Sequence, residues 1–333
     1  MKAIALCTNV TELDYHGGFR DPAICKKYPG SGWAPYLHKY ASQLGIEVVS
    51  GSDAVHAVGS GMAKIQDLQV IQEELNSNAK WLIQKGADPS LLFCFESPIF
   101  ASKFYDELPA IKHKFKRQML FGHWEGTDKV YFPSYDQNDL QTPLEWGQRR
   151  EIVAVLSNKH YSSIAPQNMQ SPSFKYAIDH QLHDARYRAL GELHNQHVLK
   201  VYGRGWPDGF ADPVDDKIEA MKLYKYALCM ENGSYPGYIT EKVIDCFVSG
   251  VVPIYAGAPD WEDYLPITAV AICDRDTHWQ AWPNFKRLLD GSGQRMIHEA
   301  QKFLRSPEGQ RHSYQGFAKN VLSILGHDVS LLA

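Results

Sequence analysis

The sequence has little of what marks membrane proteins and nucleic-acid-binding proteins. Its 333 residues carry a formal net charge of −4 at pH 7, and they contain neither a basic excess suited to nucleic acid nor a polybasic stretch suited to a membrane surface. No run approaches the ~18 to 20 consecutive apolar residues of a membrane span. We therefore expect no nucleic-acid partner, at most peripheral association with a membrane, and a cytoplasmic location.

The cysteines form no recognisable framework. The six are scattered without a CxxC pair, and most lie in apolar runs, where a thiol behaves as a small hydrophobic group. The first ten residues, MKAIALCTNV, resemble a first strand more than a signal peptide. The pattern favours reduced, structural cysteines.

Several catalytic motifs are also missing. The sequence contains no GxSxG elbow, no Walker loop and no GxGxxG, so hydrolase, NTPase and dehydrogenase functions lose their best evidence. No HxxxH pair with a supporting acid falls on a convincing helix. His180, His183 and Asp184 are expected on one solvated helix face, and no metal site is predicted.

What the sequence does contain is an alternation of strand-like and helical runs. Hydrophobic residues make up 44% of the chain, which is enough for two domains with cores of their own. We expect helices at PYLHKYASQLG and from about 63 to 85, and strands at KAIALCT, IEVVSG, LLFCFE, QMLFG, EIVAVLS, HVLKVYG, YKYALCME, VVPIYAG and AVAIC. This order predicts an α/β fold with mostly parallel sheets. The polar stretch 134–150 places the boundary between domains 1–145 and 146–333.

Polar side chains follow many of these strands. They are Glu96 after LLFCF, Ser157 and Asn158 after EIVAVL, Arg204 after HVLKVYG, and Glu231 and Asn232 after YALCM. Ligands of open α/β sheets bind beyond the carboxyl ends of the strands. These residues are therefore candidates for a binding site.

The loop GSYPGYIT leads from Asn232 into an apolar helix. Thr240 is a plausible N-cap, and Glu241 and Lys242 then occupy the first turn. A helix N-terminus after a glycine-containing loop favours anions, and Lys242 adds a charge suited to phosphate, while Glu241 can accept hydrogen bonds from a sugar diol. The alternative is that Glu241 only complements the helix dipole and Lys242 is solvated.

Three further features each allow two interpretations. Arg204 can reach a pyrophosphate bidentately or be a surface turn residue. Glu96 can be a partly buried general base or a helix-capping carboxylate. The DxD at Asp274 and Asp276 can hold a divalent cation on a nucleotide diphosphate, but a turn at the end of a strand is the favoured interpretation.

Residues 229–266, CMENGSYPGYITEKVIDCFVSGVVPIYAGAPDWEDYLP, resemble the donor-binding signature of the α-1,3/4-fucosyltransferases of glycosyltransferase family 10, with Met230 in place of the usual Phe. The resemblance extends to VLSN at 155–158 and to 185–205, the segment in which the family supplies a donor-binding Arg. It also includes FESP at 95–98, which resembles the acceptor-side motif, and GHWEGTDKVYFPSY at 122–135.

The resemblance implies the GT-B architecture, in which two Rossmann-like domains face each other across a cleft, with 1–145 on the acceptor side and 146–333 binding the donor. It implies inverting, metal-independent transfer of L-fucose from GDP-β-L-fucose to a hydroxyl of a glycan, with α-1,3 linkage to GlcNAc or glucose, and no cofactor.

The same resemblance implies roles for particular residues. Glu96 would be the general base, and Arg204 and Lys242 would stabilise the GDP leaving group. The residues expected to bind the donor are Ser157, Asn158, Arg204, Asn232, Tyr238, Glu241 and Lys242. The alternatives are a GT-B transferase with another nucleotide sugar and a non-catalytic glycan- or nucleotide-binding module.

Overall fold

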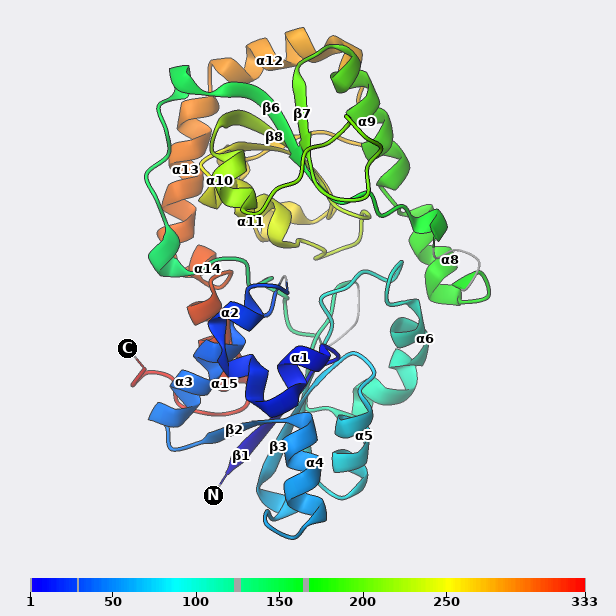
Figure 1. Cartoon of the computed structure of the whole chain (residues 1–333), viewed down its shortest axis with the longest axis vertical. Coiled ribbons are helices and arrows are strands. Elements are labelled where there is room, and N and C mark those ends of the chain that lie inside the picture. The colour runs from blue at the N-terminus through cyan, green and yellow to red at the C-terminus, as the bar shows by residue number, and fades with distance from the viewer. Residues whose placement is uncertain (1, 29, 123–126, 164–167, 333) are drawn as a thin grey trace. The chain divides into compact units, whose positions relative to one another are not determined.

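The chain divides into two compact units, which are drawn in Figure 1. The computed structural model describes residues 2–28, 30–122, 127–163 and 168–332. Residues 123–126, which include the HWE of the motif at 122–135, lie outside the described residues. Unit 1 comprises Met1–Gln137 and Gln310–Ala333, and unit 2 comprises Asn138–Gly309. Each unit holds a five-stranded sheet whose paired strands are parallel, which confirms the predicted α/β class.

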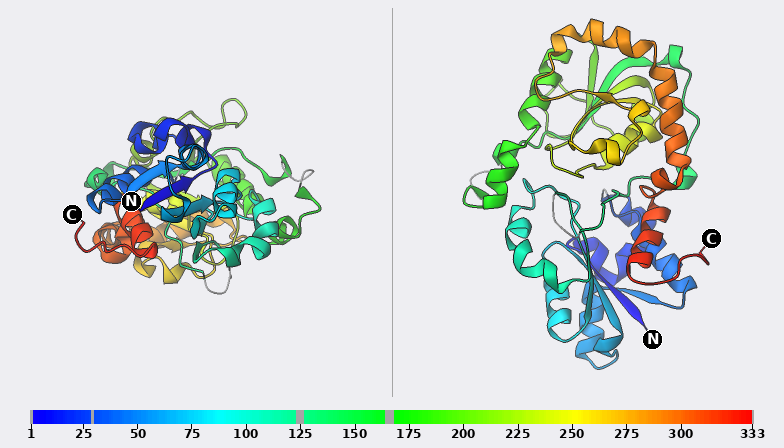
Figure 2. Two further views of the ribbon diagram at one scale, coloured as in Figure 1. Left: turned by 90° about the horizontal axis from the view of Figure 1, so that it is seen from below. Right: turned by 180° about the vertical axis from the view of Figure 1, so that it is seen from behind.

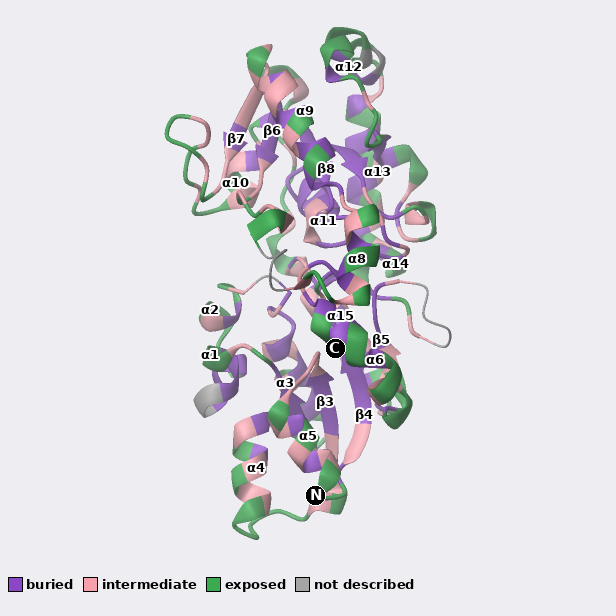
Figure 3. Cartoon of the chain, turned by 90° about the vertical axis from the view of Figure 1, so that its right-hand side faces the viewer, coloured by how far each residue is buried: buried purple, intermediate pink, exposed green. Residues whose placement is uncertain are grey.

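The sheet of unit 1 has the order β2-β1-β3-β4-β5. Its strands are β1 (Ala3–Cys7), β2 (Glu47–Ser50), β3 (Leu68–Glu73), β4 (Asp88–Phe93) and β5 (Arg117–Met119). Its helices are α1 (Thr11–Asp14), α2 (Pro22–Cys25), α3 (Ala34–Gln43), α4 (Gly51–Gly59), α5 (Ser77–Gln84), α6 (Ser102–Ile111) and α15 (Tyr314–Ile324). Figure 3 shows β3 and β4 largely buried and the outer sides of α4, α5 and α6 exposed. Strands that are covered on both faces consist of nearly continuous apolar residues, and this explains why most of the strands could be predicted from the sequence.

The predicted helix from about 63 to 85 is wrong over its first half. Residues 68–73 form β3, which lies between β1 and β4 in the sheet. Leu68, Val70 and Ile71 are buried there, and only the residues from Ser77 onward form a helix, with the Asn76 side chain as its N-cap. Burial between two strands outweighs the weak helical propensity of LQVIQE.

The C-terminal residues differ from the predicted domain division. Residues 310–333 were expected in the domain 146–333, but they belong to unit 1, because α15 packs against α3. The Trp33 and Phe317 rings meet edge to face with centroids 5.0 Å apart, and Phe317 is 1% exposed. Figure 2 shows this red C-terminal helix beside the blue helices from the start of the chain. The C-terminal helix therefore belongs to unit 1, because the apolar face of α15 is buried against α3.

The sheet of unit 2 has the order β10-β9-β8-β6-β7. Its strands are β6 (Arg150–Val155), β7 (Leu199–Tyr202), β8 (Tyr224–Met230), β9 (Val252–Ala256) and β10 (Ala271–Ile272). Its helices include α8 (Pro172–Asp179), α9 (His183–Asn195), α10 (Lys217–Met221), α11 (Glu241–Val248), α12 (Trp282–Asp290) and α13 (Gly293–Arg305), while α14 (Pro307–Gln310) spans the boundary between the units. One apolar core cluster joins β6, β8 and β9 to α9, α12 and α13.

This topology determines where polar side chains can gather in unit 2. The strands β6, β7 and β8 are neighbours and parallel, so the segments that follow them leave the sheet at the same edge. Among the described residues, the helices are too short or too polar to cross a membrane.

Candidate functional site

The backbone between β8 and α11 turns back sharply towards the end of the strand. β8 ends at Met230, so Glu231 and Asn232 follow it directly, and α11 begins at Glu241. Gly237 has φ +68°, and its N–H donates to the Asp260 carboxylate at 2.7 Å. A side chain at this position would be strained by the positive φ and would meet the Tyr264 hydroxyl at 2.8 Å. This turn brings the first residues of α11 back onto the end of β8.

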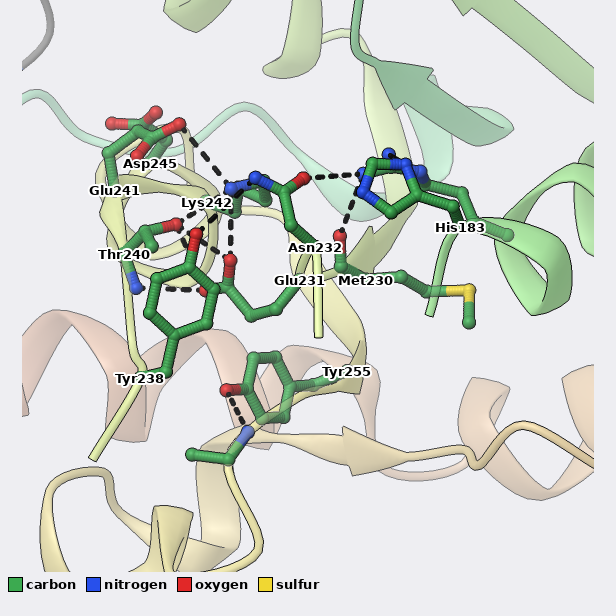
Figure 4. Close-up of polar contacts among 12 residues, drawn as sticks. His183, Met230, Glu231, Asn232, Tyr238, Thr240, Glu241, Lys242, Asp245 and Tyr255 are labelled. Carbon is green, nitrogen blue, oxygen red and sulfur yellow. Dashed lines mark hydrogen bonds and ion pairs between the residues drawn. The ribbon is translucent and has the colours of Figure 1, made fainter. Parts of the chain in front are cut away.

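A buried carboxylate, Glu231, organises the start of α11. Glu231 is 0% exposed and accepts hydrogen bonds from the Thr240 N–H (2.8 Å), the Thr240 hydroxyl (2.8 and 3.0 Å) and the Lys242 ammonium (2.9 Å). Thr240 is the N-cap residue, as predicted, but its side chain does not cap the helix; it binds Glu231 and accepts from Lys242 Nζ at 2.8 Å. Figure 4 shows this network. A charged hydrogen bond of this kind is stronger than a neutral one.

Glu241 and Lys242 are neither isolated nor simply solvated. Their charged groups lie 3.7 Å apart, and each side chain is 23% exposed. Burial opposes ionisation of Glu241, but the positive charges of Lys242 and Lys217 outweigh it and lower the pKa of Glu241 to about 2. Burial likewise opposes the charge on Lys242, but Glu231 and Glu241 raise its pKa well above the usual range. Both groups are therefore charged at neutral pH.

The structure adds a cation that the sequence did not single out, Arg186 of α9. It is 5% exposed and donates to the Asn232 side chain at 3.2 Å and to His183 Nδ1 at 2.9 Å. Its Nε atom is buried without a hydrogen-bond partner, and within the described part of the chain Arg186 makes no ion pair with a carboxylate. A buried guanidinium with an unused donor is costly unless a ligand completes its contacts.

Asn232 and Tyr238 link Arg186 to the start of α11. Asn232 accepts from Arg186 through its side-chain oxygen and donates through its amide nitrogen to the Tyr238 hydroxyl at 3.3 Å. Four of the predicted site residues therefore come together: Asn232, Tyr238, Glu241 and Lys242. We call these four, with Arg186, Glu231 and Thr240, the β8–α11 site.

The other predicted residues of this unit lie at the ends of β6 and β7. Asn158 accepts from the Tyr187 hydroxyl, and its backbone N–H donates to the Arg204 carbonyl at 2.8 Å. Ser157 and Arg204 are exposed in the same loops. Tyr187 is the neighbour of Arg186 on α9, so Asn158 adjoins the β8–α11 site. Among the described residues, the Arg204 side chain forms no hydrogen bond or ion pair with this site.

The two histidines expected on one wet helix face are on different helices. His180 is the C-cap residue of α8, and His183 is the first residue of α9 and 0% exposed. Burial and the Arg186 charge lower the pKa of His183 to about 3, so its ring is neutral and its Nδ1 accepts from Arg186. The prediction of a solvated face was wrong because the chain turns between residues 180 and 183.

The DxD forms a turn. Asp274 accepts from the Asp276 N–H and the Thr277 hydroxyl, both at 2.9 Å, beside a cavity of about 260 Å³ lined by Tyr255, Trp261 and Arg275. In the described ranges, no three His, Cys, Asp or Glu side chains are placed to hold a metal ion. The favoured interpretation of this motif matches its geometry.

Comparison with known proteins finds a family model that matches part of the chain. Residues 171–283 match the family model described as "Glycosyltransferase family 10 (fucosyltransferase) C-term". Over these residues, the chain is similar to the C-terminal domain of glycosyltransferase family 10. The match contains all seven residues of the β8–α11 site.

Individual relatives match over part of the chain. An α-(1,3)-fucosyltransferase of Helicobacter pylori is 31% identical over 33% of this chain, and a putative fucosyltransferase-like protein of Arabidopsis thaliana is 30% identical over 40%. These matches span 23% and 28% of the relatives' own lengths, about a quarter of each.

The whole fold of this chain resembles solved glycosyltransferases. A crystal structure of an α1,3-fucosyltransferase with GDP superposes with a TM-score of 0.55 over 98% of this chain and 91% of that one, at 18% identity. A glycosyltransferase of Rickettsia africae gives 0.53 over 97% of each chain at 9% identity. The predicted GT-B fold is confirmed.

In unit 1, Glu96 lies beyond the end of its strand. β4 ends at Phe93, and Glu96 is exposed, so the expected partial burial is wrong. Its backbone carbonyl accepts from the buried Tyr105 hydroxyl at 3.1 Å and lies 3.4 Å from the Cys94 thiol. The capping alternative is also wrong, because α6 begins only at Ser102 and its N-cap is Ala101.

A second carboxyl, Glu74, lies at the same edge of this sheet and was missed. It follows β3, has φ +48° and accepts from the Cys94 thiol at 3.5 Å. Burial and the Glu73 charge raise the pKa of Glu74 to about 7. A positive φ at a non-glycine residue was the structural signal for it, and nothing in the sequence marked it.

The raised pKa predicts how Glu74 affects stability. The unfolded chain loses this proton near pH 4.5, whereas the folded chain keeps it to about pH 7. The contribution of protonated Glu74 to the free energy of unfolding is therefore complete below pH 4.5, and it is lost as the pH rises to 7. Relative to Glu74→Gln, the wild-type free energy of unfolding should fall by about 2 kcal/mol across this window, a value reduced for partial exposure.

Urea unfolding of both proteins between pH 4 and 8 measures this difference. Glu47→Gln, an exposed carboxyl of β2, is the matched control and should follow the wild type. Parallel curves for wild type and Glu74→Gln would show that the pKa of Glu74 is ordinary.

Proposed function

We propose that the chain is an inverting fucosyltransferase that transfers L-fucose from GDP-β-L-fucose to a hydroxyl of a glycan, with α-1,3 linkage to GlcNAc or glucose. The observation that carries this is that two cations are held at the turn between β8 and α11: Arg186 is bonded to Asn232, and Lys242, in the first turn of α11, is bonded to Glu231. Two cations and the free N–H groups of a helix suit a diphosphate. The family match and the likeness to an α1,3-fucosyltransferase crystallised with GDP support this donor class.

Each site residue then has a chemical task. Arg186 and Lys242 neutralise the diphosphate, whose charge grows as the sugar departs, and they do so without a metal ion. Glu241, held ionised, accepts from a ribose or fucose hydroxyl, and Asn232 and Tyr238 orient the nucleotide. Ser157 and Asn158 border the nucleotide at the end of β6. Arg186 takes the role that the sequence suggested for Arg204.

Inverting transfer also needs a base for the acceptor hydroxyl, and we assign this role to Glu96. The Glu96 side chain is exposed, and its backbone carbonyl accepts from the Tyr105 hydroxyl. The location is proposed to be cytoplasmic, with at most peripheral membrane contact, and cell fractionation tests it.

A donor panel tests the reaction class. GDP-fucose and GDP should raise the melting temperature, since a ligand at 100 times its Kd adds about 2.7 kcal/mol of stability, whereas UDP-sugars should not. Transfer to GlcNAc-terminated glycans should continue in EDTA. Stabilisation by GDP-mannose or UDP-glucose alone would favour the alternative donor. Donor binding without transfer to any glycan would favour a binding module, and recovery of activity only with Mn²⁺ would overturn metal independence.

Substitution of the two arginines separates the two assignments. Arg186→Met should weaken GDP binding by about 10- to 100-fold, because one of the two cations proposed to contact the diphosphate is removed. Arg188→Met is the matched control, since Arg188 lies on the exposed side of the same helix. Calorimetric titration with GDP gives the affinities. If Arg204→Met loses more affinity than Arg186→Met, the original assignment of Arg204 is correct.

Glu96→Gln tests the base. The variant keeps the shape of the side chain, so it should bind GDP-fucose within about 3-fold of wild type and lower turnover by about 10² to 10⁴. Glu107→Gln on α6 is the control, because Glu107 is also an exposed carboxylate of this unit. Near wild-type transfer by a folded Glu96→Gln protein would exclude this carboxylate as the base.

A further inference from the structure

Unit 2 has a recess at the edge of its sheet to which the proposed function gives no role. The recess has a volume of about 260 Å³ and lies at the carboxyl ends of β9 and β10, whereas the β8–α11 site follows β8. Pockets for drug-sized ligands measure about 300–1,000 Å³, so this recess suits a ligand of one ring. The residues that line it include Leu182, Ser234, Tyr255, Gly257, Trp261 and Asp274.

The recess adjoins the β8–α11 site at Gly257. A Cβ atom at this position would lie 2.7 Å from the Cγ atom of Glu231 and 2.2 Å from the Tyr255 hydroxyl. Both distances are too short for a side chain to fit, so the Gly257 backbone packs directly against Glu231. A ligand in the recess would therefore lie next to the residues that are proposed to hold the diphosphate.

Two hydrogen-bond donors of the recess lack acceptors in the described part of the chain. Tyr255 is 1% exposed, and its hydroxyl oxygen accepts from the Ala258 N–H at 3.0 Å (Figure 4), but its own proton is donated to no residue. The indole N–H of the partly exposed Trp261 likewise forms no hydrogen bond. A buried donor without an acceptor is costly unless a ligand supplies one. The recess therefore suits a ligand with acceptor oxygens.

Asp274 adds an acceptor to the same recess. One of its carboxylate oxygens holds the turn, since it accepts from the Asp276 N–H and the Thr277 hydroxyl. The Asp274 N–H also donates to the Thr277 hydroxyl at 2.9 Å, which fixes the start of the turn. The second carboxylate oxygen has no partner among the residues that the structure describes. It is therefore available to a donor group of a ligand.

The charges at the recess favour a neutral ligand. Asp274 and Arg275 line it with opposite charges, and the carboxylate of Glu231 lies behind Gly257. A phosphate would be repelled by Asp274 and Glu231 as well as attracted by Arg275. A neutral molecule with several hydroxyls avoids this repulsion, and each hydroxyl can both donate and accept.

The apolar part of the lining fits a sugar ring. Hydroxyls project from the edge of such a ring, and its faces carry C–H groups that pack against aromatic and aliphatic side chains. The partly exposed indole of Trp261 and the side chains of Leu182 and Ile272 supply such surfaces in the recess. Aromatic, donor and acceptor groups thus lie together in a volume that suits one ring.

We propose that this recess binds one neutral sugar unit of a substrate, with Trp261 against the ring and with Tyr255 and Asp274 bonded to its hydroxyls. This inference rests on the proposed function, which supplies two sources of such a unit: the sugar of the donor nucleotide and the glycan acceptor. It gives the ends of β9 and β10 a part in substrate recognition, and it gives the first aspartate of the DxD a task that needs no metal.

Kinetics and nucleotide affinity of Asp274→Asn test the proposal in the full chain. Asparagine keeps the oxygen that holds the turn and replaces the other oxygen with an amide. The KM for the substrate whose sugar occupies the recess should rise about 10- to 100-fold, the effect of one hydrogen bond to a charged group. The Kd for GDP, which lacks the transferred sugar, should stay within about 2-fold. Asp276→Asn is the matched control, because Asp276 belongs to the same turn but does not line the recess.

The two KM values identify the source of the sugar. A rise for GDP-fucose alone assigns the recess to the sugar of the donor, and a rise for the glycan alone assigns it to the acceptor. Trp261→Ala should raise the same KM as Asp274→Asn, and melting temperatures check that both variants are folded. Unchanged KM values for both substrates overturn the proposal. An equal loss of affinity for GDP also overturns it, because the recess would then hold the nucleotide.

Failure of the proposed function would look different, since the wild-type chain would then neither bind GDP-fucose nor transfer fucose. Saturation-transfer NMR with free L-fucose and with a GlcNAc-terminated disaccharide tests the recess in that case. Sugar contact that is present in the wild type and Asp276→Asn but lost in Asp274→Asn supports the sugar site. Absence of contact with both sugars, or contact that Asp274→Asn leaves unchanged, overturns it.

Discussion

The buried ion pair between Glu231 and Lys242 is the interaction on which the site depends. Glu231 is fully buried at the end of β8, and it receives the ammonium of Lys242 together with both polar groups of Thr240. Removal of one partner would leave a buried charge without compensation, which typically costs 3–5 kcal/mol. This pair joins the end of a strand to the start of a helix, and so fixes the orientation of Lys242, Glu241 and the first turn of α11 together.

A second constraint comes from charge balance. The site holds cations and carboxylates close enough that each changes the ionisation of the next: Glu241 is kept ionised, His183 is kept neutral, and Arg186 retains a buried donor without a partner. Fixed charges of this kind need no reorganisation when a negatively charged ligand arrives, which is the electrostatic condition for stabilising a leaving diphosphate. Under the proposed function, these side chains would neutralise the charge that a metal ion neutralises in other transferases.

The sequence predicted the part of the site whose residues are close together along the chain. From Asn232 to Lys242 the chain is short, and Gly237, the N-cap position of Thr240 and the apolar stripe of α11 allow few conformations. Arg186 was missed although a signal existed: Ala189, Leu190 and Leu193 follow it at the spacing of a buried helix face. Glu74 offered no such signal, because its environment is built by residues distant in the sequence.

The sequence by itself therefore determined the α/β class, the alternation of elements, and the loop and helix that carry Lys242. Apolar periodicity and turn-forming residues determine structure over a few residues, so they can be recognised directly in the sequence. Tertiary structure alone decided that residues 68–73 are a central strand, that α15 joins unit 1, and that Arg186 reaches Asn232. These outcomes depend on which buried surfaces and charges meet across the fold, and such non-local contacts outweigh the weak preferences of each segment taken alone.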